Sequence, residues 1–394
     1  MVKFYRRKGN GSGRCRSVEM NSAKVSLGYD SQYLKLMEAA QSVPDLIDLT
    51  QCDPPLYGFS PDESAIEEAV KALKKGKVDY GDFKGYSPLI ETIEKRCSKK
   101  GTPSAVLVTH GVSEAFSLIA RAHTGKTLIP DPTYIPLYEH FRLSGGVQFY
   151  PLAEGNQWSL NEDDLRKSIT DQTRFLVIIN PNNPTGAVFK EKELKSAVDI
   201  AGEYNLILIA DEIYDGICYT PFTSLLSVSG DVPLLYLNGV SKTHRLPGFR
   251  LGYIVLSDPE EKTTSLWQNI EHLARIRLSV SYIFQTAAKV ALEKEDTSSF
   301  CEELKKRRDL CVEYLEKIED IQMITPEGTP YGFPRITCDE KKFVWNLLET
   351  GVLVTPGFSY GPSVAPHHFR VAFLQSEAAL KEAFERIASV ASSG

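Results

Sequence analysis

The sequence predicts an α/β protein in which a mostly parallel sheet lies between layers of helices. From about residue 60, apolar runs of strand length recur along the chain, and most are separated by segments with helical periodicity. This alternation is typical of parallel strands joined by helical crossovers, which cover both faces of the sheet. Because 394 residues exceed a typical single hydrophobic core, we expect two domains.

The expected elements of the larger domain follow in order along the chain. Ser60 and Glu63 have the spacing of a capping box in front of a helix that ends near Lys75, and the next helix starts at Ser87. Seven apolar runs then predict the strands of one sheet: residues 105–108, 127–129, 147–150, 175–179, 206–210, 234–237 and 253–256.

The last third of the chain predicts a smaller α+β domain. A long helical pattern over about residues 263–294 leaves the sheet, and a helix at 343–348 and strands at 352–354 and 368–373 follow. We therefore expect a large domain at 61–270 and a small domain built from 26–60 and 271–394. Residues 1–25 are basic and glycine-rich, so we expect a flexible arm there.

Composition excludes several classes of protein. With 24% charged and 42% hydrophobic residues, the chain has the composition of an ordinary soluble globular protein. The net charge of −6 argues against a general nucleic-acid binder, and no apolar run is long enough to cross a membrane. The seven cysteines form no Cys-x-x-Cys pair, which favours free thiols in a reducing cytoplasm.

We predict no metal site. The neighbouring His367 and His368 are the strongest candidates for metal ligands, but adjacent residues of an extended chain point to opposite sides. A surface pair is therefore the favoured interpretation of these two histidines.

Three short segments indicate a pyridoxal phosphate site. They are Asn180-Pro-Asn-Asn-Pro-Thr-Gly186, Asp211-Glu-Ile-Tyr214 and Leu237-Asn-Gly-Val-Ser-Lys242, in that order. A lysine amine can hold the cofactor aldehyde as a Schiff base. Once substrate displaces that amine, it can move protons at the substrate α-carbon. Lys242 is therefore predicted to be both anchor and acid/base.

The other residues of these segments suit the cofactor ring. A carboxylate from Asp211 against the pyridine nitrogen would favour the protonated form, so that the ring can act as an electron sink. Tyr214 and Asn183 could donate hydrogen bonds to the phenolic oxygen, and Tyr134 could stack on the ring face.

The phosphate group requires positive charge and free backbone N–H groups. A helix that opens near Gly111 would present the amides of Val112 and Ser113 at its N-terminus. Ser241 could add a hydroxyl and Arg250 a fixed positive charge. Several of the proposed ligands follow the ends of predicted strands, where ligands of open α/β sheets collect.

With these residues in place, the chain resembles the class I/II aminotransferases of fold type I over about residues 29–390. The segments around Gly111, Asn183, Asp211 and Lys242 are similar to those of the bacterial-type alanine (glutamate–pyruvate) aminotransferases. The resemblance implies a fold-type I transferase with a seven-stranded sheet, and it implies the same roles for Lys242, Asp211, Tyr214 and Asn183.

The resemblance also assigns two residues outside these segments. Arg370, in His368-Phe-Arg-Val-Ala-Phe373, matches the arginine that grips the substrate α-carboxylate, a task suited to a planar bidentate donor. Tyr80 matches a tyrosine that reaches the phosphate bound to the other subunit, which implies a homodimer.

Three departures from the family pattern concern the substrate pocket. Cys52 stands where the family usually has glycine, so its side chain could narrow or redirect the pocket. Gln32 stands where alanine-type relatives commonly have arginine, which weakens the expectation that glutamate is recognised there. Residues 330–346 are compressed relative to the family pattern.

The expected function is transfer of an amino group from an L-amino acid to a 2-oxo acid, with alanine and 2-oxoglutarate favoured. Asn183, Cys52 and Arg370 are the expected substrate contacts. Two alternatives stay open at this point. The same site could carry out β-elimination of cysteine-like substrates or decarboxylation, and a cofactor-sensing protein without turnover is less favoured.

Overall fold

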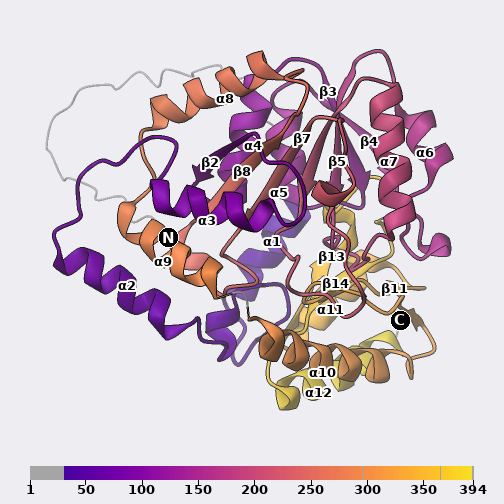
Figure 1. The fold of residues 1–394 in the computed structure, drawn as a ribbon. Helices are drawn as coiled ribbons and strands as arrows, with labels where there is room; N and C mark the ends of the chain where they lie inside the picture. The colour runs from indigo at the N-terminus through magenta and orange to yellow at the C-terminus, as the bar shows by residue number, and fades with distance from the viewer. Residues whose placement is uncertain (1–30, 295, 364, 393–394) are drawn as a thin grey trace, which may run out of the picture.

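The computed structural model describes residues 31–392 except Glu295 and Val364, and the arm expected at residues 1–25 lies outside them. Within this part, the main sheet has seven strands in the order β2-β8-β7-β6-β5-β3-β4 (Figure 1). Their bounds are β2 Ala105–Thr109, β3 Lys126–Asp131, β4 Val147–Pro151, β5 Thr173–Ile179, β6 Ile207–Asp211, β7 Leu234–Gly239 and β8 Gly252–Ser257. Each predicted apolar run overlaps one of these strands.

The sheet is mostly parallel, as the sequence predicts. Strands β3 to β7 run parallel to one another, and β8 runs antiparallel to its neighbours β7 and β2. One face of the sheet is covered by α4 Gly111–Ala122, α5 Ile135–Arg142 and α8 Thr264–Arg277. The other face is covered by α3 Ser87–Cys97, α6 Glu162–Ser168, α7 Glu191–Glu203 and α9 Tyr282–Glu293, with α2 Glu63–Lys74 packed on α9.

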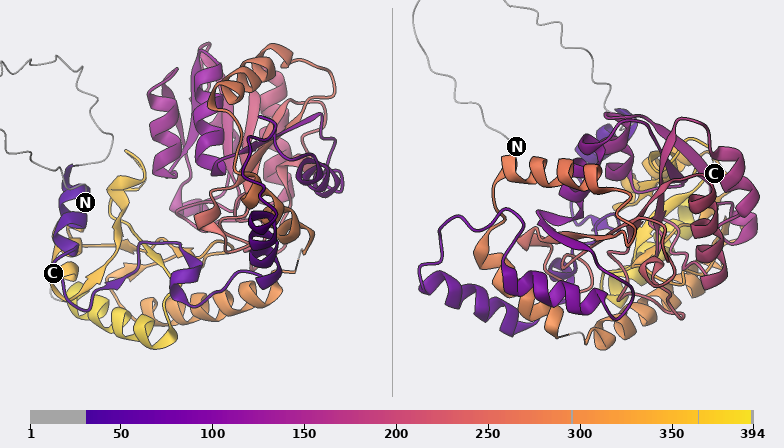
Figure 2. Two further views of the ribbon diagram at one scale, coloured as in Figure 1. Left: turned by 90° about the vertical axis from the view of Figure 1, so that its left-hand side faces the viewer. Right: turned by 45° about the horizontal axis from the view of Figure 1, so that its top comes forward.

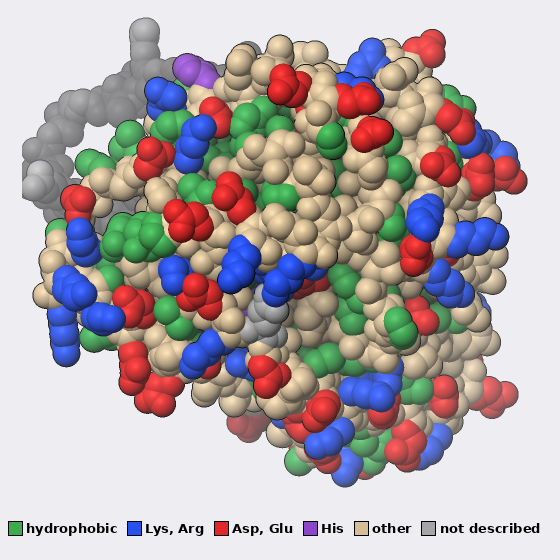
Figure 3. Space-filling model, viewed as in Figure 1, with side chains coloured by type: hydrophobic (Ala, Val, Ile, Leu, Met, Phe, Trp, Pro, Cys, Tyr) green, Lys and Arg blue, Asp and Glu red, His purple; other side chains and the backbone are tan. Residues whose placement is uncertain are grey.

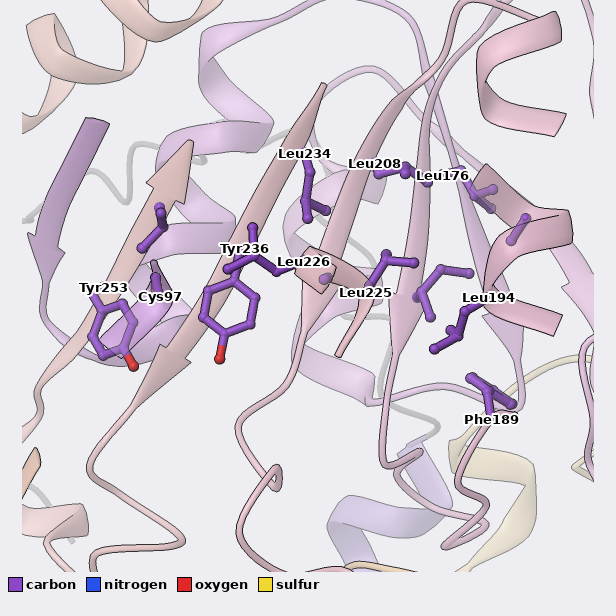
Figure 4. Close-up of a cluster of buried hydrophobic side chains, with 14 of the residues drawn as sticks. Cys97, Leu176, Phe189, Leu194, Leu208, Leu225, Leu226, Leu234, Tyr236 and Tyr253 are labelled. Carbon is purple, nitrogen blue, oxygen red and sulfur yellow. The ribbon is translucent and has the colours of Figure 1, made fainter. Parts of the chain in front are cut away.

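Burial on both faces explains why the strands read as unbroken apolar runs. Leu176 packs into the cluster shown in Figure 4, together with Leu208 and Leu234 of neighbouring strands and Leu194 of α7. The next residue, Val177, belongs to the cluster on the opposite face. Successive side chains of a strand alternate between faces, so both neighbours must be apolar when both faces are covered.

A second group of elements has its own apolar cluster, in which α10 and α12 pack against short strands (Figure 2). Its helices are α1 Ser31–Ala40, α10 Ser298–Leu315, α11 Glu340–Glu349 and α12 Glu377–Ala391. Its strands are β1 Ile47–Asp48, β9 Ile321–Gln322, β10 Tyr331–Gly332, β11 Arg335–Ile336, β12 Val352–Leu353, β13 Thr355–Pro356 and β14 Phe369–Ala372. In one three-stranded sheet, β14 lies between β10 and β13.

Short 3₁₀ helices complete the described elements. They are η1 Pro54–Tyr57, η2 Glu154–Asn156, η3 Leu225–Ser227, η4 Pro247–Phe249 and η5 Gly357–Ser359.

Two local predictions about helices are wrong. Helix α2 begins at Glu63 and is capped by Asp62, whose carboxylate accepts a hydrogen bond from the Ser64 amide at 2.9 Å. The expected capping box from Ser60 does not form. Asp62, not Ser60, has the extended backbone of the residue before the first turn, and its carboxylate caps that turn. The helical pattern over 263–294 is interrupted, because Leu278 has a φ of +68°, which ends α8 before α9 begins.

The expected surface pair of histidines is also half wrong. His367 is exposed, but His368 is only 4% exposed, and its ring stacks on Phe333 with centroids 4.9 Å apart. His368 bridges to Arg335 just before β14, and such a contact between distant segments leaves no pattern in the local sequence.

The surface of the described chain is of mixed charge. On the face shown in Figure 3, basic and acidic side chains are interspersed over the elements. No helix between residues 31 and 392 combines the length and the apolar character that a bilayer crossing requires.

Candidate active site

A cavity of about 260 Å³ brings together all the sequence-predicted site residues except Tyr80. The predicted residues that line it are Cys52, Val112, Ser113, Tyr134, Asn183, Asp211, Tyr214, Ser241, Lys242, Arg250 and Arg370. Ile179, Ile213, Pro247 and Tyr331 also line it and were not predicted. Tyr80 lies outside the cavity of its own chain and is 82% exposed.

Strand ends explain why residues so distant in sequence meet. Asp211 is the last residue of β6, Asn183 follows the end of β5, and Lys242 follows the end of β7. Because these three strands are parallel and adjacent, their carboxyl ends share one edge of the sheet. The cavity therefore forms where the sheet edge faces the second group of elements.

Asp211 is a buried carboxylate, and its side chain is 4% exposed. Burial raises its pKa to about 7, although a hydrogen bond from the Ile213 amide and the nearby charge of Lys242 both act in the opposite direction. A positively charged hydrogen-bond donor within the cavity would stabilise the ionised form.

Lys242 lines the cavity together with Asp211 and is tied to the second group of elements. Its Nζ donates a hydrogen bond to the backbone oxygen of Cys52 at 2.7 Å. Cys52 precedes η1, so this bond joins the sheet edge to the segment that leads out of β1. The amine thus points into the cavity from a fixed position.

One end of the cavity has the features of an anion site. Val112 and Ser113 lie in the first turn of α4, where backbone N–H groups have no acceptor within the helix. Gly111 has a φ of +74°, and an added Cβ there would lie 2.7 Å from an Arg250 guanidinium nitrogen. A side chain at Gly111 would therefore displace Arg250 from the helix N-terminus. This combination of amides and a guanidinium suits a phosphate.

Arg370 also lines the cavity, and it is 8% exposed. Its Nη1 donates to Asn183 Oδ1 at 3.0 Å, and its Nη2 donates to the Thr50 backbone oxygen at 2.5 Å. Its Nε is buried and has no hydrogen-bond partner among the described residues. A buried guanidinium with donor capacity left suits a carboxylate.

Tyr331 is the most informative residue that the sequence interpretation missed. Its hydroxyl lies 3.1 Å from that of Tyr214, and the Arg370 guanidinium carbon lies 4.0 Å from the centroid of its ring. Tyr331 enters the cavity because β10 pairs with β14, which places it opposite Ala372. The register between two strands about 40 residues apart cannot be seen in the local sequence. The one available signal is that a tyrosine, Tyr331, stands in the segment 330–346, which is compressed relative to the family pattern.

The residues of the cavity fit pyridoxal phosphate. The helix N-terminus and Arg250 suit the phosphate, and the buried Asp211 has a raised pKa that a protonated ring nitrogen would lower. Asn183 uses its oxygen to accept from Arg370, which leaves its amide N–H groups as donors for a phenolic oxygen.

The raised pKa of Asp211 predicts how the stability of the cofactor-free protein depends on pH. A raised folded-state pKa contributes stability that is full below pH 4 and is lost as the pH rises towards 7. The free energy of unfolding of the wild type should therefore fall with pH by up to about 1.4 kcal/mol per pH unit because of Asp211. In Asp211→Asn, we expect this contribution to the fall to disappear. Denaturant unfolding between pH 4 and 8 measures it. The buried Glu212 is present in both proteins and contributes equally to both. Parallel curves of unfolding free energy against pH for the wild type and Asp211→Asn would therefore contradict the prediction.

Comparisons with known proteins agree with this geometry. The family described as aminotransferase class I and II matches residues 44–387. The chain is 32% identical to an aspartate aminotransferase of Thermotoga maritima, over 87% of this chain and 90% of the relative. It is 31% identical to the glutamate-pyruvate aminotransferase AlaA of Escherichia coli, over 91% of this chain and 94% of the relative.

A solved structure gives the same result for the fold. An alanine aminotransferase from Pyrococcus furiosus matches with a TM-score of 0.89 and 34% identity, over 94% of this chain and 98% of that one. Strand order, cavity and sequence thus agree, and the chain belongs to the class I and II aminotransferases, pyridoxal phosphate-dependent enzymes of fold type I.

Proposed function

We propose that the enzyme transfers the amino group of alanine to 2-oxoglutarate, and of glutamate to pyruvate in reverse. The relatives named alanine or glutamate-pyruvate aminotransferase support this pair, whereas one of similar identity is named aspartate aminotransferase. The cavity supports the alanine half of this pair. Among its described residues the cations are Lys242, Arg250 and Arg370, and each already has a proposed role at the cofactor or at the α-carboxylate, so the rest of the lining suits a neutral side chain.

In this proposal Arg370 holds the α-carboxylate of the amino acid. Its unpartnered Nε and its fixed guanidinium plane, set by Asn183 and Thr50, supply the donors. The α-carbon then lies between Arg370 and Lys242. The remaining wall, with Cys52 and Ile213, is uncharged and suits a small neutral side chain such as that of alanine.

Lys242 carries the cofactor and moves the proton. Pyridoxal phosphate, when bound, supplies the electron sink that lets the α-proton leave. Lys242 would take that proton from the α-carbon and return it to the carbon on the other side of the amino nitrogen, two bonds away, since its amine is the basic group that lines the cavity there. Asp211 would keep a proton on the ring nitrogen, and Tyr214 and Asn183 would donate to the ring oxygen. Val112, Ser113, Ser241 and Arg250 would hold the phosphate, and Tyr134 would lie against the ring.

Replacement of the lysine tests this assignment. In Lys242→Ala, we expect no covalent attachment of the cofactor, as measured by mass spectrometry after borohydride reduction. Transamination should fall by at least about 10²-fold, because the proton-transfer group is lost. Lys192→Ala, an exposed lysine of α7, is the matched control and should behave as the wild type. Normal attachment and turnover in Lys242→Ala would refute the proposed role.

We also propose that the enzyme works as a homodimer. Tyr80, Val78, Ile276 and Leu278 are apolar residues exposed by 82%, 75%, 64% and 52%. They belong to neighbouring segments, since the Gly81 amide donates to Ser279 Oγ at 3.1 Å. Exposed apolar residues gathered in this way suit a partner surface. In the proposed dimer, Tyr80 reaches the phosphate site of the other subunit.

Mixing two inactive or weakened variants tests this arrangement. A Lys242→Ala subunit keeps Tyr80, and a Tyr80→Ala subunit keeps Lys242, so a mixed dimer contains one site with both residues. After subunit exchange, we expect more activity from the mixture than the two separate proteins contribute. If Tyr80 serves the site of its own chain, or serves none, mixing will give no gain.

A further inference from the structure

Inside the cavity, the side chains of Tyr214 and Tyr331 form a buried pair. Their hydroxyl oxygens are 3.1 Å apart, and their rings meet edge to face with centroids 5.8 Å apart. The residues are 4% and 3% exposed, so water does not compete strongly for these hydroxyls. Either hydroxyl can donate to the other in this arrangement.

Counting hydrogens fixes the direction of the bond in the working enzyme. Each tyrosine hydroxyl has a single hydrogen to donate. If Tyr214 donates its hydrogen to the cofactor ring oxygen, as proposed above, its oxygen can only accept from Tyr331. Tyr331 then donates to Tyr214 and Tyr214 to the ring, and hydrogen bonds in such a chain strengthen one another.

The ring of Tyr331 has a second contact, with the residue at the substrate end. The Arg370 guanidinium lies over the ring at 4.0 Å, within the range of a cation–π interaction. The ring of Tyr360 also faces this guanidinium, at 5.2 Å. Tyr331 therefore contacts one residue expected at the cofactor oxygen and one expected at the substrate carboxylate.

The surroundings hold Tyr331 in place. The Tyr331 amide donates to Thr329 Oγ1 at 3.2 Å, and β10 pairs with β14. Burial raises the pKa of Tyr331, and the neighbouring Cys52 thiol raises it further, so the hydroxyl keeps its hydrogen. Cys52, which replaces the usual glycine of the family, thus adds a side chain next to this pair.

We infer that Tyr331 is a positioning residue of the transamination: its hydroxyl orients and polarises Tyr214, and its ring holds Arg370. The inference rests on the proposed roles of Tyr214 and Arg370. One side chain, that of Tyr331, thereby joins Tyr214, the residue proposed at the cofactor oxygen, to Arg370, the residue proposed at the carboxylate.

The hydroxyl is tested by a pH titration of the bound cofactor, followed by its visible absorbance in the holoenzyme without substrate. A hydrogen bond donated to the ring oxygen stabilises the deprotonated form of the bound cofactor. A weaker hydrogen bond therefore raises the apparent pKa of the cofactor. In Tyr331→Phe, we expect an upward shift of roughly half a unit to one unit. Tyr214→Phe should shift it further, and the double variant should match Tyr214→Phe alone, since Tyr331 acts through Tyr214.

Three results separate the possibilities. A shift in Tyr214→Phe with none in Tyr331→Phe would overturn the inference and leave the proposed role of Tyr214 intact. Equal, additive shifts in the double variant would also overturn it, because Tyr331 would then act independently. No shift in Tyr214→Phe would overturn the proposed role of Tyr214 and the inference with it.

The ring is tested by the Michaelis constant for the amino donor. Tyr331→Phe keeps the ring and should leave KM near the wild-type value while kcat falls. Tyr331→Leu removes the ring, and we expect KM to rise by about threefold or more as Arg370 loses the cation–π contact. Tyr360→Phe is the matched control for a hydroxyl near Arg370 and should leave the cofactor titration unchanged. An unchanged KM in a folded Tyr331→Leu protein would contradict the role of the ring.

Discussion

The site depends on keeping one carboxylate, Asp211, buried at the edge of a parallel sheet. A buried carboxylate without a cationic partner is costly, and its raised pKa is the sign of that cost. If a cofactor ring with a protonated nitrogen binds against Asp211 as we propose, it removes this cost. Cofactor binding would then also stabilise the folded state at this edge of the sheet.

The segment that carries Asp211 is fixed by hydrogen bonds to its other acidic residues, Glu212 and Asp215. Glu212 is fully buried and accepts hydrogen bonds from Ser224 Oγ and the Leu225 amide, both at 2.6 Å. Asp215 accepts from Lys100 Nζ at 3.0 Å. Glu212, Asp215 and their partners are not among the residues that line the cavity, and their contacts fix the backbone from which Asp211 and Tyr214 project. The acidic residues of this segment therefore divide into one that lines the cavity and two that anchor the loop.

Much of this arrangement could be predicted from the sequence. The strand runs and the motifs at their carboxyl ends could be predicted, because short-range patterns determine strands and parallel strands gather their ends. Arg370 was predicted from the family resemblance alone. Tyr331 could not be read, since its place depends on the register of β10 with β14. The buried position of His368 was missed because it depends on a bridge to Arg335, which is distant in the sequence. The predicted start of α2 was wrong for another reason. Two potential caps, Ser60 and Asp62, lie two residues apart, and the backbone conformation determines which of them caps the helix.

The most direct test of the central claim is a single-turnover experiment with the purified holoenzyme and one amino acid, without any 2-oxo acid acceptor. We expect one equivalent of pyruvate per subunit from alanine, and one of 2-oxoglutarate from glutamate, with no further release. Continued release of pyruvate from a thioether amino acid without an acceptor would indicate β-elimination instead, and no release from any donor would contradict transamination by this site.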